Sequence, residues 1–212
     1  TYQFGDNYKF AYSISPEGGN LVTLGYEQAV PLLGSQTEFG RTWADWRHYF
    51  ALPWRHQVLA VRAQGGATVG SHGGKFYLGG FQSATYLPNV DLRTASTVGT
   101  DLIDLRGYNL GAQTGDKAFA LSTEYRFPLA TLDRGYSVYP VFVTTLSGAL
   151  FAETGQAWDG VFDPRKSLAS VGAELVIAGD VAQAPGQVRL GIGQGLVNAG
   201  WPALYMDLGS YF

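Results

Sequence analysis

The sequence predicts an all-β fold, an antiparallel transmembrane β-barrel of about eight strands with a ninth visible, in a single domain over residues 1–212. Two observations carry this prediction. Segments of about ten residues alternate apolar with polar side chains, and almost no window shows helical periodicity. Charged residues are also scarce, at 15% of the chain, against about 25% in an average soluble domain. No apolar run is long enough for a transmembrane helix.

Nine segments read as candidate strands. They lie at residues 2–14, 20–31, 36–50, 55–67, 117–128, 141–157, 168–179, 186–196 and 203–212. Single-chain bacterial barrels normally have an even number of strands. Two alternatives therefore stay open: residues 2–14 do not span, which leaves eight strands, or strands upstream of this sequence complete a larger barrel. Because an unpaired strand edge is not tolerated in lipid, a half-barrel must close on itself or pair with another chain.

The polar side of these strands distinguishes a membrane barrel from a soluble sheet. In residues 117–128 one face carries Phe119, Leu121, Tyr125 and Phe127, and the other carries Ala120, Ser122, Glu124 and Arg126. Glu174 and Arg189 occupy the polar side of two later segments. A soluble sheet buries its apolar face, whereas ionised groups among glycines suit a wet or plugged lumen. Aromatic residues in "WADWRHYFALPW" (residues 43–54) are expected at a membrane interface. The alternative is a soluble β-domain with core aromatics.

Two further segments are distinctive. The terminal strand at about 203–212 alternates and ends on an aromatic residue, which resembles the C-terminal signal of outer-membrane barrels; its signal residues are Tyr205, Leu208 and Phe212. The run at about 70–116 shows no clear strand or helix pattern, and connections of this length are uncommon unless they are functional. It contains "DLRGYNLG" (residues 104–111), where an arginine and a tyrosine stand in an otherwise small and polar stretch.

The order of motifs resembles the C-terminal half of the BamA/TamA-type bacterial surface-antigen barrels, over roughly residues 55–212. These motifs are "FYLGG" at 76–80, "LRGY" at 105–108, "EYRFPL" at 124–129, "GALFAETGQAW" at 148–158 and "SVGAEL" at 170–175. The resemblance implies a sixteen-stranded barrel whose sixth extracellular loop folds back into the lumen. Its tip, Arg106, Gly107 and Tyr108, would act as a latch against the wall.

The same resemblance supplies acidic partners for the arginine. A Phe-x-Asp-x-Gly wall motif matches Phe151, Glu153 and Gly155, with Glu in place of Asp, and Glu124 is a second acid on the wall. Acidic partners are also expected on physical grounds, because an arginine in a confined lumen needs carboxylates to accept its hydrogen bonds. We therefore expect Arg106 to contact Glu153.

For function, the resemblance implies insertion or translocation of polypeptides at the bacterial outer membrane, without enzymatic chemistry. Its partners would be outer-membrane lipid and unfolded outer-membrane proteins or a translocated polypeptide, and the terminal strand would form a seam with the first strand. One alternative is a short or truncated barrel that acts as a passive channel or as a structural homo-oligomer. The weakest alternative is a lipid hydrolase built on Ser71, His72 and either Asp159 or Asp163, whose spacing does not suggest a nucleophile held by a base.

Composition excludes several other classes of protein. The net charge of −3 provides no broad basic face for nucleic acid. Cysteine is absent, so disulfides and thiolate metal sites are ruled out. The three histidines, His48, His56 and His72, lack a tight metal-ligand spacing, and we expect no metal and no cofactor.

Overall fold

A computed structural model describes residues 1–10, 12–30, 38–70, 74–80, 84–85, 101–135, 141–181 and 184–209. Ten strands form one sheet in which every pair is antiparallel. In sheet order they are β1 (Tyr2–Gly5), β2 (Gly19–Ala29), β3 (Phe39–Ala51), β4 (Val58–Gly70), β9 (Lys117–Gly135), β10 (Val141–Trp158), β11 (Leu168–Val181), β12 (Ala184–Gly195), β13 (Ala203–Gly209) and β6 (Ala84–Thr85). The all-β antiparallel fold is confirmed.

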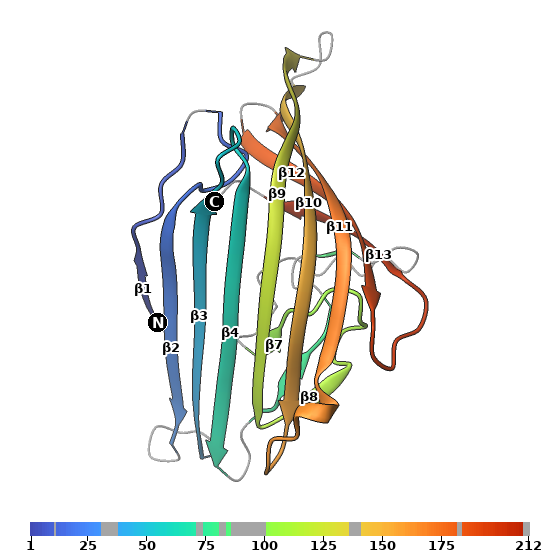
Figure 1. The fold of residues 1–212 in the computed structure, drawn as a ribbon. Coiled ribbons are helices and arrows are strands. Elements are labelled where there is room, and N and C mark those ends of the chain that lie inside the picture. The colour runs from blue at the N-terminus through green and yellow to red at the C-terminus, as the bar shows by residue number, and fades with distance from the viewer. Residues whose placement is uncertain are drawn as a thin grey trace.

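The sheet curves so that one face is concave, with β12 and β13 passing behind β9, β10 and β11 in Figure 1. Because side chains alternate along a strand, the period of two places the charged set on this face. Glu124 and Glu174 are buried there, and Arg189 lines a cavity. Large apolar side chains stand exposed on the opposite face, among them Leu24, Trp46, Phe50, Leu121, Leu150, Val171, Leu190, Ile192 and Leu204. An apolar outer surface of this kind suits lipid.

The long connection between β4 and β9 is partly structured, which corrects the expectation of a run without strands. Its segments β5 (Phe76–Leu78), β7 (Leu102–Ile103) and β8 (Gln113–Gly115) form a second, three-stranded sheet that includes one parallel pair. In Figure 1 this small sheet lies behind β9, β10 and β11. Strands of two or three residues are too short to show a period of two, so the sequence pattern does not predict them.

An apolar core fills the space between this small sheet and the wall. Its buried members from the connection are Phe76, Leu78, Ile103, Leu105 and Tyr108, and those from the wall are Ala118, Ala120, Ala157 and Leu168. Small wall residues leave room for the larger side chains of the connection. The core therefore fixes the connection against the inside of the sheet.

Two strand expectations need correction. The predicted strand at 2–14 is only four residues long. The predicted strand at 203–212 is seen as β13 up to Gly209, and Phe212 lies outside the described residues. Closure of the barrel is not seen in the described part of the chain. There, β1 pairs only with β2, and the outer edge of β13 pairs with β6, where Met206 faces Thr85. The expected seam between the first and last strands is not seen among the described residues, where two residues of the long connection pair with this edge.

The N-terminal segment (residues 6–10 and 12–18) lies at the end of the sheet opposite the long connection. It leads into β2, whose first residue, Gly19, pairs with Tyr49 near the β3–β4 turn. Ser13, Ser15 and Glu17 in this segment are buried.

The prediction that the aromatic residues in 43–54 lie at a membrane interface is partly wrong, since Tyr49 lines a cavity on the concave face while Trp46 and Phe50 point outward. Among the described residues, no helix has the length and apolar character needed to cross a membrane.

Candidate functional site

The loop tip (residues 104–108) is the part of the long connection that reaches the charged wall. Leu105 is fully buried in the apolar core just before the arginine. Backbone hydrogen bonds between Leu105 and Gly80, and between Gly80 and Tyr108, hold the tip to the preceding part of the connection. The packing of Leu105 in the apolar core and the backbone hydrogen bonds to Gly80 therefore position the tip.

Arg106 is buried at 3% exposure among three carboxylates from three neighbouring strands. Its Nε donates to Glu153 Oε1 at 2.7 Å, and its backbone N–H donates to Glu153 Oε2 at 2.7 Å. Its Nη1 lies 2.5 Å from Glu124 Oε1 and 2.7 Å from Glu174 Oε1. Ordinary alternation on β9, β10 and β11 is what aims these three acids inward. A buried guanidinium needs such partners, because its desolvation would otherwise be prohibitive.

The aromatic ring of Phe151 completes the arginine site. The guanidinium carbon of Arg106 stands 3.8 Å from the centre of this ring, a cation–π contact. Gly172 of β11 is required beside it, since a Cβ there would stand 2.3 Å from the Phe151 ring. The wall motif residues Phe151 and Glu153 thus contact Arg106 directly. Gly155, the third member, packs against Leu78 and the backbone of Phe119 instead.

Gly107 and Tyr108 bring the tip against β12. Gly107 has φ +86°, and a Cβ there would meet the backbone of Gln194 and Gly195 at 3.0 Å. The Tyr108 hydroxyl lies 2.8 Å from the carbonyl oxygens of both Ala169 and Val197, and it accepts a hydrogen bond from Val197 N–H. Each residue of the Arg-Gly-Tyr tip therefore makes its own specific contact with the inside of the sheet.

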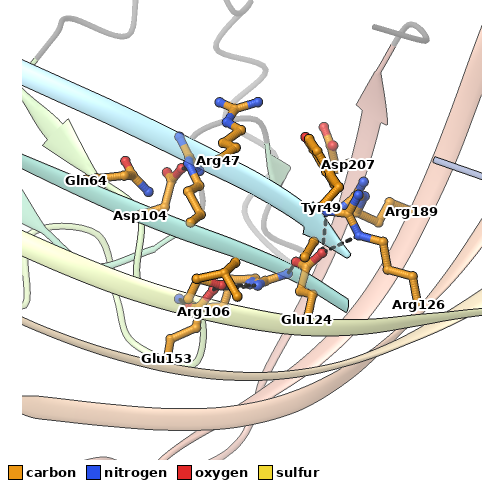
Figure 2. A pocket seen from close by; sticks show the side chains of 14 residues that line it. Arg47, Tyr49, Gln64, Asp104, Arg106, Glu124, Arg126, Glu153, Arg189 and Asp207 are labelled. Atoms are coloured by element: carbon orange, nitrogen blue, oxygen red, sulfur yellow. Dashed lines mark hydrogen bonds and ion pairs between the residues drawn. The ribbon is translucent and has the colours of Figure 1, made fainter. Parts of the chain in front are cut away.

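Further ion pairs surround the tip. Arg62 of β4 donates to Asp104 Oδ2 at 2.9 Å and to Asp45 Oδ2 at 2.7 Å. A cavity of about 450 Å³ opens above the tip, and Figure 2 shows its charged lining. The labelled residues are Arg47, Tyr49, Gln64, Asp104, Arg106, Glu124, Arg126, Glu153, Arg189 and Asp207. The tip thus forms one wall of a polar, water-accessible space.

Two contacts of the tip were not anticipated from sequence. Glu174 was placed on the polar face of its strand, but nothing identified it as a partner of Arg106, or of Tyr205, whose hydroxyl donates to Glu174 Oε1 at 2.5 Å. The Arg62–Asp104 pair was also missed. Alternation indicates the inward positions of Arg62, Glu174 and Tyr205, whereas Asp104 lies in the long connection. Which of them meet depends on the register of strands far apart in the sequence.

The other sequence candidates do not assemble at the tip. Ser71 and His72 lie outside the described residues. Asp163 caps the short 3-10 helix η3 (Pro164–Lys166) by accepting from Arg165 N–H. On the outer face His48 stacks on Trp46 and makes an edge-to-face contact with Phe50. Tyr205 lies on the inner face, whereas Leu208 is known here only by its pairing with Val188.

Asp159, a candidate residue of the hydrolase alternative, forms an exposed ion pair with Lys75. Lys75 Nζ donates to Asp159 Oδ2 at 2.8 Å, and Asp116 N–H donates to Asp159 Oδ1 at 2.7 Å. These bonds hold the pKa of Asp159 below its ordinary value, and Asp159 in turn raises the pKa of Lys75. The pair ties the start of the long connection to the β10–β11 turn.

The chain was compared with known protein families. The profile of the Omp85 superfamily domain matches residues 10–200, which is most of the chain. A search of curated proteins finds no match.

Proposed function

Since this chain belongs to the Omp85 superfamily, we propose that it works in the insertion or translocation of polypeptides at the bacterial outer membrane. Barrels of this family reside in outer membranes, transport or insert proteins, and catalyse no chemical reaction, so the chain is not an enzyme. Its partners in this proposal are outer-membrane lipid and an unfolded outer-membrane protein or a translocated polypeptide. The loop tip serves as a latch inside the lumen.

The observation that carries the latch is the burial of Arg106 among Glu153, Glu124 and Glu174. Removing one partner from such a cluster leaves uncompensated buried charge, which opposes release of the loop. The latch thus keeps the long connection inside the sheet while the outer face remains in lipid. A held plug also keeps the barrel from leaking while a polypeptide is handled.

The edges of the sheet bear on assembly. Within the described residues β1 is an edge strand, and β13 is covered by only two residues of β6. Exposed strand edges carry unsatisfied backbone groups, which lipid cannot hydrogen-bond. We propose that in the membrane these edges pair with further strands, either from the same protein or from a second copy.

The experiment is an insertion assay in liposomes. An unfolded outer-membrane barrel protein is diluted from urea into vesicles that contain this protein, and the folded fraction is followed by its resistance to protease. We expect faster folding than in empty vesicles, and slower folding with Arg106→Ala than with the control Arg165→Ala, whose side chain is exposed on η3.

Other outcomes would point elsewhere. Ion conductance without any acceleration of folding would favour a passive channel or a structural barrel. Acceleration that is identical in the wild type and in Arg106→Ala would contradict the latch while leaving the insertion function in place.

A further inference from the structure

The cavity above the loop tip adjoins a second one beneath the N-terminal segment, and five residues line both. The two measure about 450 and 480 Å³. Both are lined by Arg47 of β3, Arg126 of β9 and Arg189 of β12, together with Tyr49 and Glu124. We propose that this shared space binds tetrahedral oxyanions from water, such as phosphate or sulfate, through Arg47, Arg126 and Arg189.

The three arginines lie closer to water than the glutamates that pair with two of them. The arginine side chains reach into the cavity, with exposed fractions of 39% for Arg47, 22% for Arg126 and 18% for Arg189. Two of the carboxylates that pair with them lie deeper, at 8% for Glu124 and 0% for Glu174. An ion entering from water therefore meets guanidinium groups first, with the acids behind them.

The three arginines also keep N–H donors that their acidic partners do not use. Arg47 donates two hydrogen bonds, both to Asp45, and Arg126 pairs with Glu124 through Nε and Nη2. Arg189 uses Nη1 for Glu174, while its Nε is buried without a partner in the described part of the chain. A guanidinium has five N–H groups, so each arginine keeps donors that no described residue accepts. An oxyanion in the cavity would accept from the remaining Nη groups of these arginines, whereas Arg189 Nε is enclosed by protein.

The side chains of Arg126 and Arg189 converge on one part of the cavity. Figure 2 shows Arg126 and Arg189 reaching into one region of the cavity from different strands, near Tyr49. Like charges brought together repel, and a bound anion removes this repulsion. Asp207 stands opposite Arg189 in the β12–β13 register and also lines the first cavity, but it is buried.

Position and shape decide the class of ligand. The cavity opens on the concave face, whereas the outer face carries the apolar side chains that suit lipid. The anion therefore comes from water and not from a lipid headgroup. Several guanidinium groups around one space favour an oxyanion with several acceptor oxygens over a chloride ion.

The test is protection of these arginines from chemical modification. The full chain, folded in vesicles of zwitterionic lipid, is treated with phenylglyoxal in sodium sulfate or in sodium chloride of equal ionic strength. Mass spectrometry then gives the modification rate at each arginine. At a sulfate concentration about ten times the dissociation constant, we expect modification of Arg47 to slow by about tenfold. Exposed Arg165 serves as the internal control and should not change.

The same experiment can overturn the proposal. Rates at Arg47, Arg126 and Arg189 that are equal in sulfate and chloride would exclude oxyanion binding. So would equal slowing at Arg165, because that would be a general salt effect. Neither result bears on insertion activity, so failure here is distinguishable from failure of the proposed function.

A variant sharpens the assignment. Arg47→Gln removes one cation but leaves Asp45 paired with Arg62 at 2.7 Å, so it creates no unpaired buried acid. We expect about tenfold more sulfate to be needed to protect Arg126, which corresponds to the loss of one charge-assisted hydrogen bond. Arg165→Gln is the matched control. Unchanged protection of Arg126 in a folded Arg47→Gln protein would remove Arg47 from the site, and the wild-type comparison decides if the variant does not fold.

Discussion

The loop tip and the N-terminal segment enter the concave face from opposite ends, and different chemistry holds them. Arg106 in the tip is buried and contacts three carboxylates. In the N-terminal segment Glu17 accepts from Ser13 and lies 2.6 Å from His56 Nδ1, at a rim where the histidine side chain is 30% exposed. A buried charge network resists release far more than a rim contact that water can replace. The tip is thus expected to be the firmer of the two attachments.

The largest expected effect comes from breaking the tip network. Arg106→Ala removes the cation shared by three buried acids, and we expect it to lower the free energy of unfolding by about 3–5 kcal/mol. Urea unfolding from lipid vesicles measures this quantity. Arg165→Ala should leave it almost unchanged. A loss as small as that of the control would mean that the tip is not firmly held.

The second effect concerns backbone fit at the tip. Gly107→Ala places a Cβ 3.0 Å from the β12 backbone at φ +86°, and we expect it to cost about 1–3 kcal/mol. Gly111→Ala is the matched control, because Gly111 also has positive φ, at +69°, but its nearest neighbour is 3.5 Å away. Both variants carry backbone strain, so the difference between them measures the close approach to β12. Equal losses would contradict this tight contact.

The third effect tests the other attachment. Glu17→Ala removes the acceptor of Ser13 and the partner of His56, with an expected loss of about 1–2 kcal/mol. Faster hydrogen exchange should be confined to the N-terminal segment, while peptides covering the loop tip keep their protection. Exposed Glu38→Ala serves as the control. A loss larger than that of Arg106→Ala would reverse the comparison between the two attachments.

The smallest effect is pH-dependent. Because the folded-state pKa of Asp159 is lowered, its pair with Lys75 contributes above the ordinary value of 3.8 and is lost as pH falls through the lower folded value. Because the pKa of Lys75 is raised, the same contribution is lost again as pH rises through a value above 10.5. Both groups are exposed, so the change in melting temperature should be slight. Asp159→Asn should flatten it, whereas Asp133→Asn should not.

The strand pattern was largely predictable because a strand fixes which side each residue faces. Alternation alone placed Glu124 and Glu174 inward, and the structure has both buried. Residues 2–14 misled, because only residues 2–5 pair as β1, and Tyr8 forms just an isolated bridge with Gly18. Alternation says which face a residue occupies, but not how far along its neighbour a strand pairs.

The site was less predictable, and for a physical reason. The prediction that Arg106 meets Glu153 came from the resemblance of the motifs, not from spacing. Contacts of Glu174 with both Arg106 and Tyr205 depend on the registers of β11, β12 and β13. Those registers are set by the turns and by the apolar pattern of whole strands, so the motif around Arg106 does not reveal them.

The most direct test of the central claim is a double-mutant cycle between Arg106 and Glu153. The free energy of unfolding is measured for the wild type, Arg106→Ala, Glu153→Ala and the double variant, in the same vesicles. If the tip is held by this pair, the two single losses should exceed the double loss by about 1–3 kcal/mol. Additive losses, with a coupling energy near zero, would contradict the latch.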